Sequence, residues 1–351
     1  MHLKPCFKPE YYRVKVVAIK EEIPEVKTIF LETEGKIICR AGQFLTFVFA
    51  GRQGEERRSY SLSGSPEMKE PMAITVKRVP NGRYSRPLID GLQVGDVLSV
   101  SGASGQFVLP EDVDDYHQIF FFAAGIGITP VLSLIKTLLH LHPKVEVVLL
   151  YSNTSVDTTV FYEEILSLHE KFSHRFLPEF LFSSAPDLNR ARLSKWLLPQ
   201  LLSEYSTAEK ENQLFYTCGP FAYMRMVSLS LVEAGYSTEQ IRKENFDTSR
   251  PALKVQPPDR DMHEVLIVLK GKEYRLQVQY PQSILQAARA HKISLPYSCD
   301  TGRCGSCMMY CKEGEVWMSY NEVLTDKDVS QGKVLTCTGY PIGGDVRLSM
   351  D

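Results

Sequence analysis

Four cysteines near the C-terminal end constrain this sequence more than any other feature. Cys299, Cys304 and Cys307 form a C-x4-C-x2-C arrangement, and Cys337 follows after a further 29 residues. An even number of crowded cysteines indicates either disulfides or metal ligation. The N-terminal residues contain no apolar stretch typical of a secretory signal, and disulfides are rare in proteins of reducing compartments. We therefore expect these four thiols to hold a metal centre.

The spacing of the four cysteines favours a [2Fe–2S] cluster, because C-x4-C-x2-C with a distant fourth cysteine is the plant-type pattern. Gly302, Gly305 and Ser306 are small, so the loop backbone can wrap closely around a cluster. We expect Arg303 near the charge of the cluster, and Cys311 as a bystander. The alternative is a structural zinc site, but such sites usually pair two short cysteine hooks, and only one is short here.

The chain divides into segments of different pattern. Short β-branched or aromatic stretches with glycine-containing turns predict a small antiparallel barrel in the first segment. Continuous apolar stretches alternate with helical ones in the second, which predicts a parallel α/β sheet. Three prolines and mixed charge indicate a linker, after which β patterns return. The predicted segments are 1–112, 113–247, the linker 248–262, and 263–351.

Composition excludes two classes of partner. The chain has 351 residues, a net charge of −2 and no basic stripe, so nothing points to nucleic acid. No stretch of about 18 apolar residues suggests a membrane span. We therefore expect a cytoplasmic protein without a membrane span.

A short polar motif at Arg58-Ser59-Tyr60-Ser61 opens a strand-like stretch. It combines a cation for phosphate, an aromatic face and a hydroxyl, which are the groups that a flavin nucleotide needs. Alternation along a strand would place Arg58 and Tyr60 on one face and Ser61 on the other. By itself the motif also fits an exposed arginine beside a strand tyrosine.

A second motif, GIGITP, follows the apolar stretch IFFFAA and precedes a helical one. Glycines at such a turn let a pyrophosphate approach the backbone, and a helix N-terminus favours its negative charge. This is half of a dinucleotide fingerprint. A tight strand-to-helix turn without a ligand is the alternative.

The order of these motifs resembles known families. The stretches YSCDTGRCGSCMMYCKEGEV and VLTCTGYP resemble the plant-type ferredoxin family, over about residues 263–351. The stretches RSYS, VKRV with GRYS, GASGQF, AAGIGITP, YTCGP and ENF, in that order, are similar to the ferredoxin–NADP reductase superfamily. Within it, the chain resembles oxygenase reductases that carry a C-terminal ferredoxin domain.

The resemblance implies a fold, cofactors and site residues. The fold would be an antiparallel β-barrel for FAD, preferred over FMN, a parallel-sheet nicotinamide domain and an α+β β-grasp ferredoxin domain. The implied cofactor-binding residues are Arg58, Ser59, Tyr60, Ser61, Val76, Lys77, Gly82, Arg83, Tyr84, Ser85, Gly125, Gly127, Thr129, Pro130, Cys218, Gly219, Pro220 and Phe246. The implied catalytic residues are Ser61, Cys218, Glu244 and Phe246, and the implied cluster ligands are Cys299, Cys304, Cys307 and Cys337.

The resemblance also implies a reaction. Hydride would pass from NADH or NADPH to FAD, and single electrons would leave through the cluster to an external protein, an oxygenase or a desaturase. The donor stays open. The loop after VEVVLLY lacks an arginine for a 2′-phosphate, and the strand end lacks an acidic residue for a free 2′-hydroxyl. Arg190 and Arg192 either reach the phosphate from another loop or have a surface role. The candidates for an acidic surface that faces the acceptor are Glu313, Glu315, Glu322, Asp326 and Asp328, and a solvated face is the alternative for each of them. The alternatives are a partner-independent diaphorase or quinone reductase, and a redox-sensing regulator.

Overall fold

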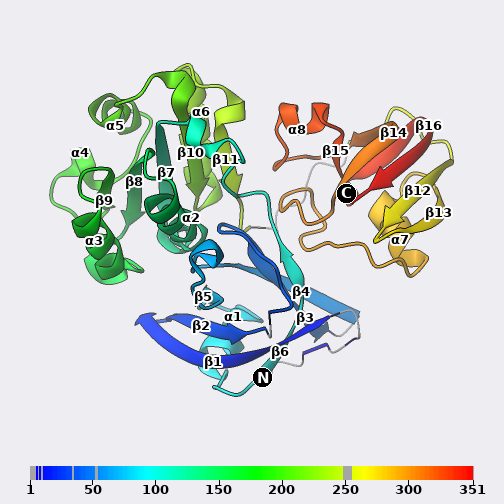
Figure 1. Ribbon diagram of the computed structural model, residues 1–351, viewed down its shortest axis with the longest axis horizontal. Helices are drawn as coiled ribbons and strands as arrows, with labels where there is room; N and C mark the ends of the chain where they lie inside the picture. The colour runs from blue at the N-terminus through cyan, green and yellow to red at the C-terminus, as the bar shows by residue number, and fades with distance from the viewer. Residues whose placement is uncertain are drawn as a thin grey trace. The chain divides into compact units, whose positions relative to one another are not determined.

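The chain folds into two compact units, residues 1–246 and 247–351, shown as a computed structural model in Figure 1. The structure describes residues 5, 6, 8, 11–33, 35–51, 54–247 and 255–350. The first seven residues of the predicted linker, 248–254, lie outside these described residues.

The first unit begins with an antiparallel sheet in the order β4-β3-β6-β1-β2-β5. Its strands are β1 (Tyr12–Ile23), β2 (Val26–Glu32), β3 (Phe44–Gly51), β4 (Gly54–Ser61), β5 (Ala73–Lys77) and β6 (Val97–Ser104). A short helix, α1 (Ser85–Asp90), follows β5. An antiparallel bridge between Leu62 and Ile74 joins the ends of the two edge strands, so the sheet closes into the predicted barrel.

Alternating side chains form this barrel. On β1, Val14 and Val16 are fully buried, whereas Arg13 and Lys15 are exposed. This period of two places one row of side chains in the barrel core and the other in water. The apolar rows of the other strands fill the same core, which also receives α1.

The second part of the first unit is a parallel sheet in the order β11-β10-β7-β8-β9. Its strands are β7 (Gln118–Ala124), β8 (Glu146–Asn153), β9 (Phe176–Phe182), β10 (Gln213–Cys218) and β11 (Ile241–Glu244). The helices are α2 (Ile128–Leu141), α3 (Tyr162–Lys171), α4 (Leu188–Ala191), α5 (Leu197–Tyr205) and α6 (Phe221–Glu233). This confirms the predicted α/β domain, although β9 and β11 are absent from the sequence pattern.

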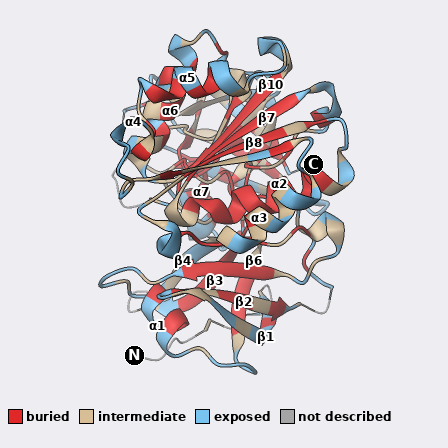
Figure 2. Cartoon of the chain, turned by 90° about the vertical axis from the view of Figure 1, so that its left-hand side faces the viewer, coloured by how far each residue is buried: buried red, intermediate tan, exposed pale blue. Residues whose placement is uncertain are grey.

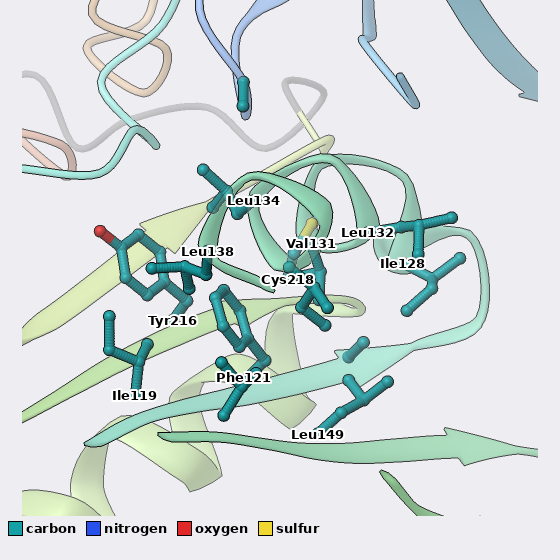
Figure 3. Packing of buried hydrophobic residues seen from close by; sticks show 14 of the residues in the cluster. Ile119, Phe121, Ile128, Val131, Leu132, Leu134, Leu138, Leu149, Tyr216 and Cys218 are labelled. Carbon is teal, nitrogen blue, oxygen red and sulfur yellow. The ribbon is translucent and has the colours of Figure 1, made fainter. Parts of the chain in front are cut away.

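Both faces of this sheet are buried, as Figure 2 shows for β7, β8 and β10. Phe121 faces α2 and α3, while Phe120 and Phe122 face α5 and α6. Figure 3 shows the first of these cores, in which Cys218 and Tyr216 of β10 lie beneath α2. Burial on both faces explains why these strands have continuous apolar sequences.

The second unit contains a mixed sheet in the order β13-β12-β16-β14-β15, in which only β12 and β16 pair in parallel. Its strands are β12 (His263–Leu269), β13 (Lys272–Val278), β14 (Met308–Met318), β15 (Lys333–Leu335) and β16 (Gly339–Ser349). The helices are α7 (Ile284–Ala290) and α8 (Asp326–Ser330). A capping box between Ser283 and Gln286 begins α7, whose apolar face packs on the sheet. This is the predicted β-grasp arrangement.

Candidate functional site

The predicted nicotinamide motifs meet at the carboxyl ends of the parallel strands. Gly125–Gly127 forms a single 3-10 turn after β7, and α2 begins at Ile128. A Cβ on Gly127 would lie 2.2 Å from the carbonyl oxygen of Cys218, so no larger residue fits there. The turn after β7 and the turn after β10 are therefore in direct backbone contact. Ligands of open parallel sheets bind at this edge.

Three side chains from distant parts of the first unit gather at the same edge. The Ser61 hydroxyl, at the end of β4, lies 3.2 Å from both carboxylate oxygens of Glu244 and donates to them. Glu244 ends β11 and pairs in register with Cys218, which ends β10. Ser61, Glu244 and Cys218 are all buried. The structure thus brings together three of the four residues that the resemblance implies as catalytic.

Burial changes the acidity of two of these groups. Loss of hydration raises the pKa of Glu244 from 4.5 to about 8, although the hydrogen bond from Ser61 opposes the shift. Burial, together with the nearby Glu244, raises the pKa of the Cys218 thiol well above its ordinary value. Glu244 is therefore protonated at neutral pH, and Cys218 is a thiol and not a thiolate. The roles of both in catalysis remain predictions.

Phe246, the fourth of these residues, follows β11 by two positions and is 43% exposed. An aromatic ring so exposed is available to cover a planar ligand. Thr129 and Pro130 are in the first turn of α2, and Pro220 caps α6. A Cβ on Gly219 would lie 2.9 Å from that of Ala124, which again keeps two turns close together. These positions fit the predicted nucleotide site.

The two predicted flavin motifs also meet. The Arg58 guanidinium of β4 lies 4.5 Å from the ring centroid of Tyr84, and that of Arg83 lies 5.5 Å from it. A Cβ on Gly82 would lie 2.3 Å from the Ser85 hydroxyl and 2.9 Å from the Val79 carbonyl oxygen, so a larger residue would force this turn to shift. Two cations beside a tight turn form a suitable donor set for the diphosphate of FAD. The residues present therefore fit that cofactor.

Other predicted flavin residues have structural partners. Tyr60 packs edge-on against Phe47, with ring centroids 5.7 Å apart, and the Ser59 hydroxyl bonds that of Thr46 at 3.1 Å. The Ser85 hydroxyl accepts a hydrogen bond from the Val79 amide at 3.1 Å. Val76 and Lys77 end β5. Their contacts with a flavin remain predictions.

Glu56 joins this group, although nothing in the sequence pattern indicates it. Its carboxylate accepts hydrogen bonds of 2.5 Å from both Arg83 and the Tyr84 hydroxyl, and it lies 4.0 Å from Arg58. The Tyr84 bond, followed by the two arginines, lowers the pKa of Glu56. A carboxylate thus lies among the cations predicted to bind phosphate.

Tyr151 is a second residue that the sequence does not indicate. Its hydroxyl donates to the carbonyl oxygen of Gly125 at 3.0 Å. The ring is fully buried at the end of β8. This hydrogen bond supports the glycine turn, and it joins residues that are 26 positions apart in the sequence.

The two arginines considered for the adenosine phosphate have different surroundings. Arg190 forms ion pairs with Glu179 and Glu204 and lies 3.5 Å from the former. Arg192 is exposed. Arg190 is therefore already paired with two carboxylates of its own domain.

The four predicted ligand cysteines lie in two pairs. The Cys304 thiol donates to Cys299 and lowers the pKa of Cys299 to about 5, while the Cys337 thiol bonds Cys307. The Thr301 amide also donates to the Cys299 sulfur at 3.4 Å. Cys311 bonds backbone carbonyls of its own hairpin and is outside these pairs.

This pairing suits two irons that each take two thiolates. Four thiols in this arrangement form the donor set that a [2Fe–2S] cluster takes.

The five acidic residues expected to face an acceptor are not alike. Glu313, Glu315 and Asp326 are exposed. Asp328 instead caps α8 and pairs with Lys333 at 2.6 Å. The Glu322 side chain is 15% exposed and bonds Arg303. Only the three exposed residues remain candidates for a docking surface.

Three family models match the chain. They are an oxidoreductase FAD-binding domain at residues 14–109, an oxidoreductase NAD-binding domain at 121–229, and a 2Fe-2S iron-sulfur cluster binding domain at 267–341. Within the described residues, no helix is both long and apolar enough to cross a membrane.

Two similar proteins match this chain over most of their own length. The ferredoxin reductase component of 3-ketosteroid-9-alpha-monooxygenase from Rhodococcus rhodochrous is 31% identical over 95% of each chain. One component of the 1,2-phenylacetyl-CoA epoxidase from Escherichia coli is 29% identical over 89% of this chain and 88% of its own.

Among solved structures, phthalate dioxygenase reductase has the same fold. It aligns with a TM-score of 0.58 and 24% identity over 97% of this chain and 98% of its own. The sequence, the paired cysteines and the converging motifs lead to one conclusion. The chain belongs to the ferredoxin–NADP reductase superfamily, as an oxygenase-type reductase with FAD, NAD(P)H and [2Fe–2S] domains.

Proposed function

We propose that this protein is the reductase component of an oxygenase system, which oxidises NADH or NADPH and supplies electrons to a separate oxygenase. The observation that carries the proposal is the convergence of Ser61, Glu244 and the Gly127–Cys218 contact at one strand edge, in a chain that also holds two paired sets of cysteines. The relatives named as monooxygenase and epoxidase components support the choice of an oxygenase.

When bound, FAD would accept one hydride, which carries two electrons, and the cluster would carry single electrons. The chain's own residues bind and align them. Arg58 and Arg83 would hold the diphosphate, and Tyr60 would supply an aromatic face. Gly125 and Gly127 admit the nucleotide phosphates at the start of α2. The exposed ring of Phe246 would cover the flavin and give way to the nicotinamide.

At the reacting edge, Ser61 supplies a hydroxyl within 3.2 Å of a carboxyl group that keeps its proton at neutral pH. A protonated Glu244 adds no negative charge where hydride must arrive. Cys218 lines the same edge with a neutral, buried thiol. These roles follow from position and charge together.

We further propose that NADH is the preferred donor. No arginine follows β8 in the adjoining loop, and Arg190 is held by Glu179 and Glu204. Of the arginines considered for a 2′-phosphate, Arg192 is then the remaining candidate. We place the protein in the cytoplasm, where both nucleotides are supplied and thiols stay reduced.

The test is reconstitution. Purified holoprotein is mixed with an oxygenase from the same cell, and substrate-dependent oxygen uptake is measured with NADH and with NADPH. We expect uptake only when reductase, oxygenase and substrate are all present, and faster with NADH. Equal turnover of quinones without any partner, with no transfer to an oxygenase, would support the diaphorase alternative.

A further inference from the structure

A buried ion pair lies inside the loop that carries the cluster ligands. Arg303 stands between Cys299 and Cys304, and its side chain is only 4% exposed. Its Nε donates to Oε2 of Glu322 at 3.0 Å. Glu322, 15% exposed, comes from the stretch between β14 and α8. Two opposite charges are thus largely taken out of water, one of them within the loop that carries the first three ligands.

Further contacts fix this pair in place. The Tyr320 hydroxyl donates to the same carboxylate oxygen of Glu322 at 2.9 Å, and the Arg303 guanidinium lies 5.3 Å from the centroid of the Tyr320 ring. The Glu322 amide donates to the carbonyl oxygen of Gly302 at 3.0 Å. A Cβ on Gly302 would lie 2.6 Å from the Tyr320 carbonyl oxygen. Side chains and backbone together hold the ligand loop against residues 320–322.

A contribution to the stability of the fold does not by itself explain this ion pair. A buried ion pair stabilises a fold little more than an apolar pair of similar size, because both charges lose hydration. The charges nevertheless act strongly on a neighbour in the same low-dielectric region. A [2Fe–2S] cluster on four thiolates is anionic and becomes more so when reduced. An adjacent guanidinium favours the reduced form, and an adjacent carboxylate opposes it.

We propose that the opposite charges of Arg303 and Glu322 together set the reduction potential of the cluster. Arg303 raises the potential, and Glu322 limits that rise and directs the guanidinium. The inference rests on the cluster, and it holds whichever protein accepts the electrons.

The test is the midpoint potential of the cluster in the holoprotein, measured by redox titration with electron paramagnetic resonance. In E322Q the guanidinium is unopposed, and we expect a higher potential. In R303Q the carboxylate is unopposed, and we expect a lower one. The expected shift is at least about tenfold in the electron-transfer equilibrium, which is about 59 mV for a one-electron couple. R303K keeps the charge and should lie between R303Q and the unchanged protein.

Two controls distinguish an effect of charge on the potential from a general loss of structure around the cluster. R275Q removes one partner of the exposed Arg275–Glu264 pair on β13 and β12, and it should leave the potential unchanged. Iron content and the spectrum report whether each variant holds its cluster. If R303Q loses the cluster, E322Q and R303K still decide the outcome. Shifts of E322Q and R303Q in the same direction, or no shift in E322Q, would overturn the proposal.

Discussion

Glu244 is a carboxyl group that burial keeps protonated at neutral pH. Ser61 donates to it, but one hydroxyl at 3.2 Å does not replace full hydration. The folded pKa of about 8 lies above the ordinary value of 4.5. A group with a raised folded pKa contributes its full stability below the unfolded pKa and loses it as the pH rises through the folded one.

We therefore expect a larger fall in the free energy of unfolding for the unchanged protein than for E244Q when the pH rises from about 5.5 to about 8.5. The difference should be about 3 kcal/mol, because each pH unit below the folded pKa corresponds to about 1.4 kcal/mol and the effect flattens above a pKa of about 8. Denaturant unfolding of both proteins at the two pH values measures it. E211Q, at an exposed position, is the control. Identical pH dependence of E244Q and the unchanged protein would contradict the assignment.

Glu56 gives a second prediction at the residue scale. Its carboxylate competes with the FAD diphosphate for Arg58 and Arg83, so E56Q should bind FAD about three- to tenfold more tightly. Fluorescence titration of the flavin-free protein measures the affinity. E55Q is the matched control, because Glu55 bonds Tyr11 and Lys8 instead. Weaker binding by E56Q, or an equal gain in E55Q, would show that Glu56 does not face the diphosphate.

At the scale of elements, the site depends on turns that must touch. The turn between β7 and α2 meets the end of β10 through Gly127, where a Cβ would lie 2.2 Å from a backbone carbonyl oxygen. Backbone cannot move aside as a flexible side chain can. The nucleotide site is thus built by the packing of two loops as much as by side chains.

G127A should therefore weaken NADH binding at least about tenfold while FAD remains bound, because the two turns must separate. Stopped-flow reduction of the flavin at several NADH concentrations gives the apparent dissociation constant. G91A is the control, since a Cβ there would have 3.3 Å to its nearest neighbour, at the end of α1. Unchanged NADH affinity in G127A would show that the contact between the two turns does not build the nucleotide site.

How far the sequence predicts these elements depends on their burial. Strands buried on both faces, such as β7, are read directly from continuous apolar residues. β9 contains Pro178 and Glu179, and β11 reads Ile-Arg-Lys-Glu, so neither has such a pattern. Both are edge strands that pairing with β8 or β10 defines. Edge strands tolerate proline and charge, which hides them.

The site is predictable in part for a related reason. Motifs with fixed spacing, such as the four cysteines, are visible because their chemistry needs that spacing. Partners far apart in sequence are not visible. Glu56, Tyr151 and the link between Arg303 and Glu322 depend on tertiary contacts. Glu322 shows the consequence, because the sequence suggests an acceptor contact and the structure shows a buried partner.

At the scale of the whole molecule, electron entry and exit are carried by different units. C304A should abolish the cluster signal and electron transfer to an oxygenase, while NADH still reduces the flavin at nearly the same rate. Iron content, paramagnetic resonance and stopped-flow absorbance measure the three properties. C311A should keep the cluster, because Cys311 lies outside both thiol pairs. A cluster that survives in C304A would exclude the proposed ligand set.

The measurement that tests the central claim most directly is an anaerobic titration of the purified holoprotein with NADH, followed by absorbance and paramagnetic resonance. The account predicts that flavin and cluster bands both bleach, with about three electron equivalents taken up per chain, two by the flavin and one by the cluster. Uptake of only about two equivalents, with a cluster that stays oxidised, would contradict an electron path from nucleotide through flavin to iron and sulfur.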